Sequence, residues 1–385
     1  MMEPSTELLE VAKQFASDVI APNAEHWERL GRVPYDVFES AGEAGLCGLM
    51  VPTALGGRGA GIEGMAAAME ALAGACMNTA FALIVHNNLA GFIAANGTAA
   101  HHERYLEAML TGRRIGAFLL TEPGAGSDAQ AIETVAERDG DDWILSGDKA
   151  WISNTTSADI LSVYVQTAPG SGAKGIAAFL VDADLDGIVR SDGYELMRGH
   201  ALGTGAFRFD GCRVANDRMI LAPGEAFRGA MAGINTARIA VAAMCCGVLR
   251  ESLAVSVRYA ETRAAFGQST LEFQGLNWML AEVATNLEAA RGLTRAAIEA
   301  ATNDADTTLA AAHAKKFATR VAFDGIAECM QAMGAAGYRA EYPLARHLAS
   351  AKMAQFLDGT TQIQNVVIAR TLRTHYAAAA TIGQA

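Results

Sequence analysis

The spacing of apolar residues changes twice along this chain, and that change limits the possible folds more than any other feature. Residues 6–111 place apolar side chains at helical spacing. Residues 115–221 instead contain short apolar or alternating runs, separated by turn pairs such as Asp139-Gly140. Long helical patterns return from residue 225 onward. An all-α protein would lack the middle section, and a dinucleotide-binding α/β protein would alternate helix with strand, so this order predicts an α+β fold.

We therefore predict an N-terminal helical domain at residues 1–112, a middle antiparallel β-domain at residues 113–222 and a C-terminal four-helix bundle at residues 223–385. The expected strands are residues 115–121, 143–146, 160–167, 176–182 and 206–209. The expected long helices are residues 227–262, 271–302, 306–333 and 343–357, with a last one from Thr361. Alanine-rich helices of this length pack closely in a bundle.

The composition excludes several classes of function. Apolar residues make up 51% of the 385 residues and charged residues 19%, which is typical of a globular protein with a large core. The net charge is −12 and no block of lysine and arginine is longer than a pair, so no nucleic-acid partner is expected. The six cysteines and eight histidines show no metal-ligand spacing, so no metal site is expected. Residues 1–10 do not read as a signal segment, and no apolar run reaches membrane-spanning length without interruption. We expect a cytoplasmic protein with no membrane partner.

The segment LTEPGAGSD, residues 120–128, is rich in glycine but lacks the lysine and the spacing of a P-loop. Further short motifs are GDKAWISN at residues 147–154, RAAFG at 263–267 followed by Gln274, QAMGAAGY at 331–338 and DGTTQIQ at 358–364. With these motifs in this order, the sequence resembles the acyl-CoA dehydrogenase family of flavoenzymes over nearly its whole length. The resemblance implies that family's three-part fold, FAD as the cofactor and an acyl thioester as the substrate.

Carried over residue by residue, the resemblance assigns FAD contacts to Leu120, Thr121, Gly126, Ser127, Trp151, Ser153, Arg263, Phe266, Gln274, Gln331, Gly334, Ala335, Thr360 and Gln362. It assigns substrate contacts to Ser127, Arg238 and Gly359. Hydroxyl groups and the bare N–H groups of a glycine-rich turn suit the polar edge and pyrophosphate of a flavin nucleotide, and an indole can lie against its ring. In the family, the segments around Arg263 and Gln331 reach the FAD of a neighbouring subunit, which implies a homodimer or homotetramer.

Several of these residues also have simpler interpretations. Trp151 could fill a core, Arg263 could belong to a surface ion pair, and Ser153 could complete a strand edge. His86 and His200 fit packing or rim positions better than catalytic ones, because neither lies in a ligand or nucleophile pattern.

Asp358 is the candidate catalytic base. Taken locally, Asp358 and Gly359 form a common turn pair, and Thr361 with Gln364 has the spacing of a capping box for the next helix. The resemblance instead places Asp358 where most of the family has its catalytic glutamate. That residue removes the proton α to the thioester carbonyl while hydride leaves the β-carbon for the flavin. Phe356 and Leu357 would provide the apolar surroundings that raise the pKa of such a carboxylate.

This aspartate is one methylene shorter than the family's glutamate, and a displacement of roughly 1 Å can slow a reaction by about a hundredfold in a fixed pose. Some relatives carry the glutamate on an earlier helix, but the matching residue here is Ala237. Residues 197–204 also depart from the family pattern, and there Arg198 and His200 could either contact the substrate or be solvated.

The leading hypothesis is therefore FAD-dependent dehydrogenation of an acyl thioester carried on CoA or on an acyl carrier protein, in a biosynthetic setting with an unusual substrate or bond position. The reduced flavin would pass electrons to a flavoprotein partner. The alternative is a flavin oxidase or monooxygenase of the same fold, since nitroalkane-oxidising relatives use an aspartate at this position. A third hypothesis is a catalytically silent or DNA-associated relative, against which the acidic charge counts.

Overall fold

The structure is a computed structural model that describes residues 6–303 and 305–373. The first five residues and the end of the third predicted domain, residues 374–385, lie outside the described residues. The chain divides into two compact units, residues 1–234 and 235–385, and each is described by itself. This division is coarser than the three predicted domains, whose boundaries stay a prediction.

The first unit begins with helices. Their bounds are α1 Thr6–Phe15, α2 Ala21–Leu30, α3 Tyr35–Glu43, α4 Gly61–Ala75, α5 Met77–Asn96 and α6 Ala99–Leu110. A π-helical turn, Ala16–Ile20, joins α1 to α2. Buried residues occupy nearly every side of α4 and α5. These two helices therefore form the centre of the helical layer, consistent with their continuous apolar sequence.

A sheet follows the helices. Its strands are β1 Gly116–Leu119, β2 Val135–Asp139, β3 Asp142–Ile152, β4 Ile160–Gln166, β5 Ile176–Asp182, β6 Ile188–Arg190, β7 Gly205–Ala215 and β8 Met219–Leu221. The hydrogen-bonded order is β6-β7-β3-β2-β4-β5-β8, with β1 against β4. Most neighbours are antiparallel, as expected, but β1 and β2 both pair with β4 in parallel, so the sheet is mixed.

Every residue of β4 and β5 is buried, which explains why their sequences read as almost continuous apolar runs. One face of these strands packs on α5 and α6 through residues such as Ile93 and Tyr105. The sheet curves over the other face, where Trp143 of β3 meets Phe179 of β5 edge-on with ring centroids 5.7 Å apart. Long β3 and β7 have exposed, charged positions, and for that reason the sequence revealed only part of each.

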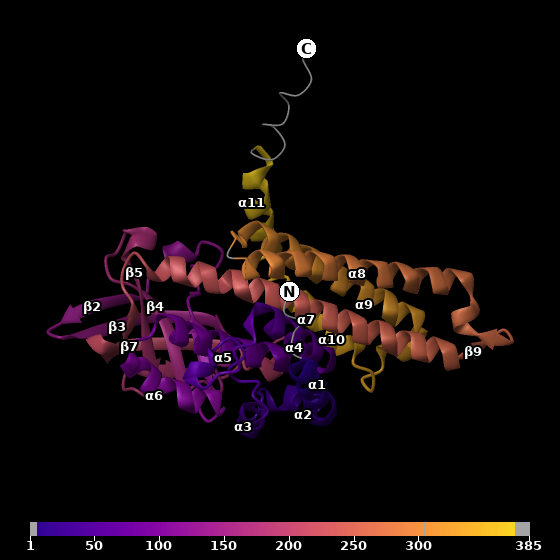
Figure 1. The fold of residues 1–385 in the computed structure, drawn as a ribbon, viewed down its shortest axis with the longest axis horizontal. Helices are drawn as coiled ribbons and strands as arrows, with labels where there is room; N and C mark the ends of the chain where they lie inside the picture. Colours follow the sequence, from indigo (N-terminus) through magenta and orange to yellow (C-terminus); the bar gives the residue numbers. More distant parts are fainter. Residues whose placement is uncertain (1–5, 304, 374–385) are drawn as a thin grey trace, which may run out of the picture. The chain divides into compact units, whose positions relative to one another are not determined.

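The second unit is helical and includes most of α7, Ala226–Thr262, together with α8 Gln274–Thr302, α9 Thr308–Ala332, α10 Leu344–Ala354 and α11 Thr361–Leu372. A small hairpin of β9, Ala264–Ala265, and β10, Gln268–Ser269, separates α7 from α8. These bounds confirm the expected long helices. In Figure 1, α8 runs alongside α9, on which α10 and α11 also pack.

Helix α9 is the centre of this second layer. Gly325 of α9 permits close packing, because a side chain there would meet Leu249 of α7 at 2.8 Å and Val283 of α8 at 3.2 Å. Ser256 of α7 also donates to the carbonyl of Cys329 on α9 at 2.7 Å. By length and hydropathy α7 could cross a membrane, but most of that apolar stretch is buried in the protein, as in a core helix.

The side chain of Asn87 connects α5 to residues 46–49 through hydrogen bonds. Its side-chain amide donates to the carbonyls of Leu46 and Leu83 at 2.8 and 2.9 Å, and its carbonyl oxygen accepts from the N–H of Leu49 at 2.8 Å. The side chain is fully buried, so water cannot replace these bonds.

We expect Asn87→Ala to lower the free energy of unfolding by about 3 kcal/mol, because buried backbone groups lose their partners. Urea denaturation followed by circular dichroism measures this change. The matched control is Asn96→Ala on the same helix, since the exposed Asn96 amide donates only to the carbonyl of Phe92. Equal losses of unfolding free energy in Asn87→Ala and Asn96→Ala would contradict this structural role of Asn87.

Candidate active site

The glycine-rich turn at residues 120–128 follows β1 and presents backbone donors to solvent. Reciprocal bonds between Glu122 and Ala125, at 3.1 and 3.2 Å, close the turn. Beyond it, Gly126 and Ser127 are exposed, and their N–H groups have no acceptor among the described residues. Leu120 is buried and Thr121 half-buried behind them. Such a row of free N–H groups suits an anionic ligand.

A buried ion pair holds this turn in place. Lys149 of β3 is fully buried, and its ammonium donates to the Glu122 carboxylate at 2.7 Å and to the carbonyl of Leu120 at 3.2 Å. Glu122 also accepts from the N–H groups of Glu133 and Thr134 at 2.6 and 3.0 Å. Burial opposes the charged form of Glu122, but the Lys149 charge and these donors outweigh burial and lower its pKa. Both residues lie inside recognised motifs, yet the sequence did not mark them as a pair.

Trp151, at the end of β3, is 62% exposed, so within this chain it does not fill a core. Its backbone has φ of 59°, and Asn154 three residues later has φ of 62°. Side chains rarely adopt this left-handed region, and such strain is often found at functional sites. The half-buried Ser153 lies between them, just past the end of β3 rather than within it. Tyr194 supports the indole edge-on at a centroid distance of 5.0 Å.

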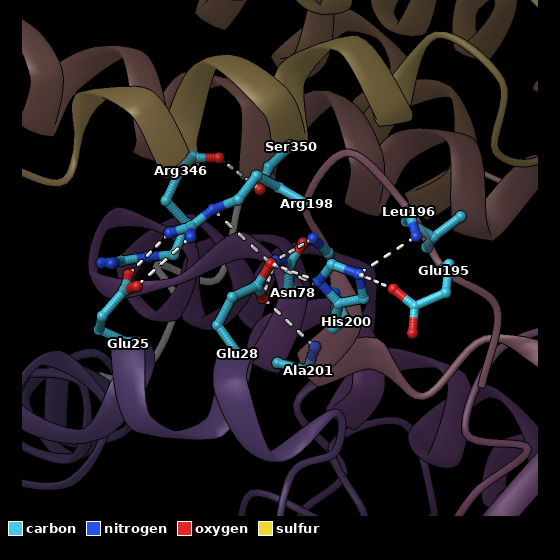
Figure 2. Close-up of polar contacts among 11 residues, drawn as sticks. Glu25, Glu28, Asn78, Glu195, Leu196, Arg198, His200, Ala201, Arg346 and Ser350 are labelled. Atoms are coloured by element: carbon cyan, nitrogen blue, oxygen red, sulfur yellow. Dashed lines mark hydrogen bonds and ion pairs between the residues drawn. The ribbon is translucent and has the colours of Figure 1, made fainter. Parts of the chain in front are cut away.

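The loop at residues 194–204 forms hydrogen bonds with the segment that follows Trp151. Carbonyls of Leu202 and Gly203 accept from the N–H groups of Asn154 and Thr156 at 3.0 and 3.3 Å. Figure 2 shows Glu25 and Glu28 of α2 pointing toward this loop.

Glu28 is 3% exposed and accepts from the N–H groups of Gly199, His200 and Ala201, the last two at 3.2 and 3.3 Å. This carboxylate thus does for the loop what Glu122 does for the glycine-rich turn.

The departures from the family pattern at Arg198 and His200 have a structural explanation. Arg198 forms a two-point contact with Glu25, at 2.7 and 3.3 Å (Figure 2). His200 is half-buried, and its ring accepts from the N–H of Leu196 at 3.1 Å. Arg198 is therefore paired rather than merely solvated, and both residues help to shape the loop.

His86 of α5 is a packing residue, as expected. Its ring is fully buried between the Met109 carbonyl at 3.0 Å and the Gly116 N–H at 3.2 Å. Burial lowers the pKa of His86 to about 4, so the ring is neutral at physiological pH.

In the second unit, the predicted cofactor residues Arg263, Phe266 and Gln274 gather at the hairpin between α7 and α8 (Figure 1). All of them are exposed, Phe266 by 97% with φ of 51°. Arg263 has no ion-pair partner within the described part of the chain. The surface ion pair considered from the sequence is therefore not formed among the described residues. An apolar ring held outward in a strained turn favours a contact with another molecule.

A second exposed group lies at the end of α9. Gln331 is on its last turn, and Gly334 and Ala335 begin the 3-10 segment Gly334–Tyr338. Gly334 has φ of 60°, and a Cβ added there would meet no other atom within 4 Å. These residues, like those at the hairpin, have little protein around them in the described chain.

Asp358 lies on the turn between α10 and α11, with φ of 50°. The expected capping box at Thr361 and Gln364 is wrong: the N-cap is Thr360, whose hydroxyl accepts from the N–H of Ile363 at 3.4 Å. Gln364 instead donates to the Gly359 carbonyl at 2.9 Å, because its buried side chain turns toward the preceding turn.

One oxygen of the Asp358 carboxyl is shielded from solvent. The residue as a whole is half-buried, but its Oδ2 is buried without a hydrogen-bond partner. Burial raises the pKa of Asp358, against the opposing positive charges of Lys315 and Arg238. Phe356 beside it is 58% exposed, so the desolvation does not come from that ring within this chain. The Asp358 N–H has no acceptor among the described residues.

Arg238 of α7, predicted to contact the substrate, is 7% exposed and donates from Nε to the Asp358 carbonyl at 2.9 Å. Gly359, with φ of 90°, adjoins the same guanidinium. The structure therefore brings Asp358, Gly359, Thr360 and Arg238 together, with the exposed Gln362 on the first turn of α11. Sequence reasoning missed Lys315 of α9, whose signal is that it shares helical spacing with the buried Ala311, Ala318 and Ala322.

Comparison with known proteins identifies the family. Its N-terminal, middle and C-terminal domain profiles match residues 3–113, 117–212 and 224–373, all described as acyl-CoA dehydrogenase domains. The chain is a member of the acyl-CoA dehydrogenase family. It is 34% identical to the short-chain specific mitochondrial acyl-CoA dehydrogenase of Bos taurus, over 96% of this chain and 90% of that protein.

Two solved structures extend the comparison. Butyryl-CoA dehydrogenase from Megasphaera elsdenii is 31% identical with a TM-score of 0.92, covering 97% of this chain and 98% of that one. The prolyl acyl carrier protein oxidase AnaB is 26% identical with a TM-score of 0.89, covering 96% of this chain and 99% of that one. This acyl-CoA dehydrogenase family member is thus an FAD-dependent oxidoreductase. The free N–H groups at Gly126 and Ser127 and the outward Trp151 fit that cofactor.

We expect Lys149→Met to weaken FAD retention, because it leaves Glu122 buried without its cation and loosens the glycine-rich turn. Breaking a buried ion pair destabilises a protein by roughly 3–5 kcal/mol. Visible flavin absorbance per protein after gel filtration, and the melting temperature of the apoprotein, measure both effects. Lys174→Met is the control, since Lys174 is exposed. Full FAD retention with an unchanged melting temperature in Lys149→Met would refute this role.

Proposed function

We propose that this enzyme dehydrogenates an acyl thioester, with Asp358 as the base that removes the α-proton. The observation that carries the proposal is the Asp358 carboxyl itself, with its buried unpartnered Oδ2 and raised pKa. A base with a raised pKa accepts a carbon-bound proton more readily than an ordinary carboxylate, provided that it is ionised at the working pH.

In this mechanism the carboxylate oxygen of Asp358 takes the α-proton, and the electrons of that C–H bond form the new double bond as hydride leaves the β-carbon. FAD, when bound, accepts that hydride. Charge develops on the thioester oxygen as the α-proton leaves. The N–H of Asp358 is a suitable donor for that oxygen, because it has no acceptor within the described chain.

The short side chain of Asp358 limits how the substrate can be placed. A carboxylate one methylene nearer to its backbone requires the α-carbon to approach the turn more closely than a glutamate would. We propose a substrate other than a simple straight-chain ester, with CoA or an acyl carrier protein as the carrier. The similarity to a prolyl acyl carrier protein oxidase supports the second carrier.

The same proposal extends to partners and location. The exposed, strained Phe266 and the exposed end of α9 support a homodimer or homotetramer in which these residues meet another subunit. We further propose an electron-accepting flavoprotein as the redox partner and the cytoplasm as the location.

The second candidate is a flavin oxidase or monooxygenase, nitroalkane-oxidase-like, and the aspartate in place of glutamate favours it. Oxygen separates the two. After reduction by substrate, an oxidase recovers its visible flavin absorbance rapidly in air, whereas a dehydrogenase recovers it rapidly only with an electron-accepting flavoprotein.

We expect Asp358→Asn to lose flavin bleaching by acyl thioesters, by roughly 10²–10⁴-fold in rate, because the amide cannot accept the proton. The measurement is anaerobic mixing with a panel of acyl-CoA and acyl carrier protein thioesters while the visible absorbance is followed.

Two control variants sharpen this result. Asp324→Asn on α9 removes an exposed carboxylate and should bleach at the original rate. Asp358→Glu restores a carboxylate and should bleach measurably, with a changed order of preferred substrates. Undiminished bleaching in Asp358→Asn would remove Asp358 as the base. Bleaching by nitroalkanes alone would favour the second candidate.

A further inference from the structure

Donors from three separate helices meet beneath the turn that carries Asp358. Arg238 of α7 donates to the Asp358 carbonyl at 2.9 Å. Lys315 of α9 donates to the next carbonyl, that of Gly359, and Gln364 of α11 donates to the same oxygen at 2.9 Å. All three side chains are buried, Lys315 to 1% exposure. We call this group the carbonyl clamp.

The turn needs such a clamp because its backbone is unfavourable. Asp358 and Gly359 have φ of 50° and 90° in succession, and only the second is glycine. A side chain at residue 359 would approach the guanidinium of Arg238 to 3.1 Å and the amide of Gln364 to 3.2 Å. A left-handed aspartate persists only when its surroundings hold it there. The clamp holds its carbonyl, and so sets the direction in which its carboxyl leaves the turn.

We propose that Lys315 is a positioning residue for the base: from α9 its buried ammonium holds the Gly359 carbonyl and supplies positive charge beneath the Asp358 carboxylate. This proposal rests on the proposed function only for the role of Asp358. The clamp itself is a property of the fold.

The charges around the turn explain why a lysine is there. The titratable and charged groups that face Lys315 are Asp358 on the turn, and Arg238 and Cys245 on α7. Burial lowers the pKa of Lys315 to about 8, with Asp358 acting in the opposite direction. Its hydrogen bond goes to a carbonyl and not to a carboxylate, so no hydrogen-bonded carboxylate neutralises its charge. A lysine buried without a hydrogen-bonded carboxylate is uncommon, and for packing alone an apolar residue would serve better.

The test compares Lys315→Met, which loses both the hydrogen bond and the charge, with Lys315→Gln, which keeps a donor and loses the charge. Lys316→Met, on the neighbouring half-buried lysine of the same helix, is the control. Amide hydrogen exchange of residues 355–364 reports the clamp without any reference to activity. Anaerobic flavin bleaching as a function of pH reports the base.

We expect faster exchange at residues 355–364 in Lys315→Met only, together with bleaching slowed by roughly 10–100-fold. In both Lys315 variants the acidic limb of the rate profile should move to higher pH. The sign follows because the Lys315 charge lowers the pKa of Asp358, so its loss means that the carboxylate ionises only at higher pH.

Unchanged exchange and an unmoved acidic limb in Lys315→Gln and Lys315→Met would overturn the proposal and leave Lys315 as a packing residue of α9. If Lys315→Met does not fold, the acidic limb of Lys315→Gln decides the outcome alone. If Asp358→Asn bleaches normally while Lys315→Met still exchanges faster at residues 355–364, the clamp stands and the proposed role of Asp358 as the base fails.

Discussion

Buried charged side chains that hydrogen-bond to backbone groups hold three turns or loops of this chain. Glu122 and Lys149 hold the glycine-rich turn, and Glu28 collects the N–H groups of the loop at residues 194–204. Arg238 and Lys315 hold the turn of Asp358. Turns satisfy fewer of their own backbone groups than helices and strands do, so in the interior other partners, such as side chains, must satisfy the rest. In the first unit two carboxylates and the ammonium of Lys149 do this, and in the second unit two cations do.

The charge balance differs between the turns in a way that suits their ligands. At the glycine-rich turn the carboxylate and the ammonium neutralise each other, and the free N–H groups of Gly126 and Ser127 remain as the local attraction for an anion. At the Asp358 turn two buried cations face one carboxylate. Burial raises the pKa of that carboxyl, and the two cations limit the rise. The carboxylate therefore binds a proton more readily than an exposed aspartate does, yet it can still ionise.

The short side chain of Asp358, the proposed base, makes its position depend on the carbonyl clamp. Since Asp358 has one methylene fewer than a glutamate, it has fewer rotamers with which to compensate for a badly placed backbone. The direction of its carboxyl therefore depends more on φ at Asp358 and on the carbonyls held by Arg238 and Lys315. A family member with an aspartate here should tolerate less movement of this turn than one with a glutamate.

Much of the fold was predictable from local pattern. Helices α7 to α11 follow from apolar residues at helical spacing, and the fully buried β4 and β5 follow from nearly continuous apolar runs. Neither pattern requires knowledge of the neighbouring elements. Strands β2, β6 and β8 were not predicted, because short, partly exposed strands carry little periodicity. The parallel pairing of β1 and β2 with β4 depends on which edges meet in space.

For the site, the sequence by itself determined the family, the FAD motifs and Asp358 as the candidate base, because each of these depends on a short stretch of adjacent residues. Only the tertiary structure showed that Gln364 turns back from its expected cap, that Glu122 pairs with Lys149, and that Lys315 lies beneath the base. The physical reason is distance along the chain. Lys315 and Gly359 are far apart in sequence, and a hydrogen bond between them exists only once α9 packs against the turn before α11.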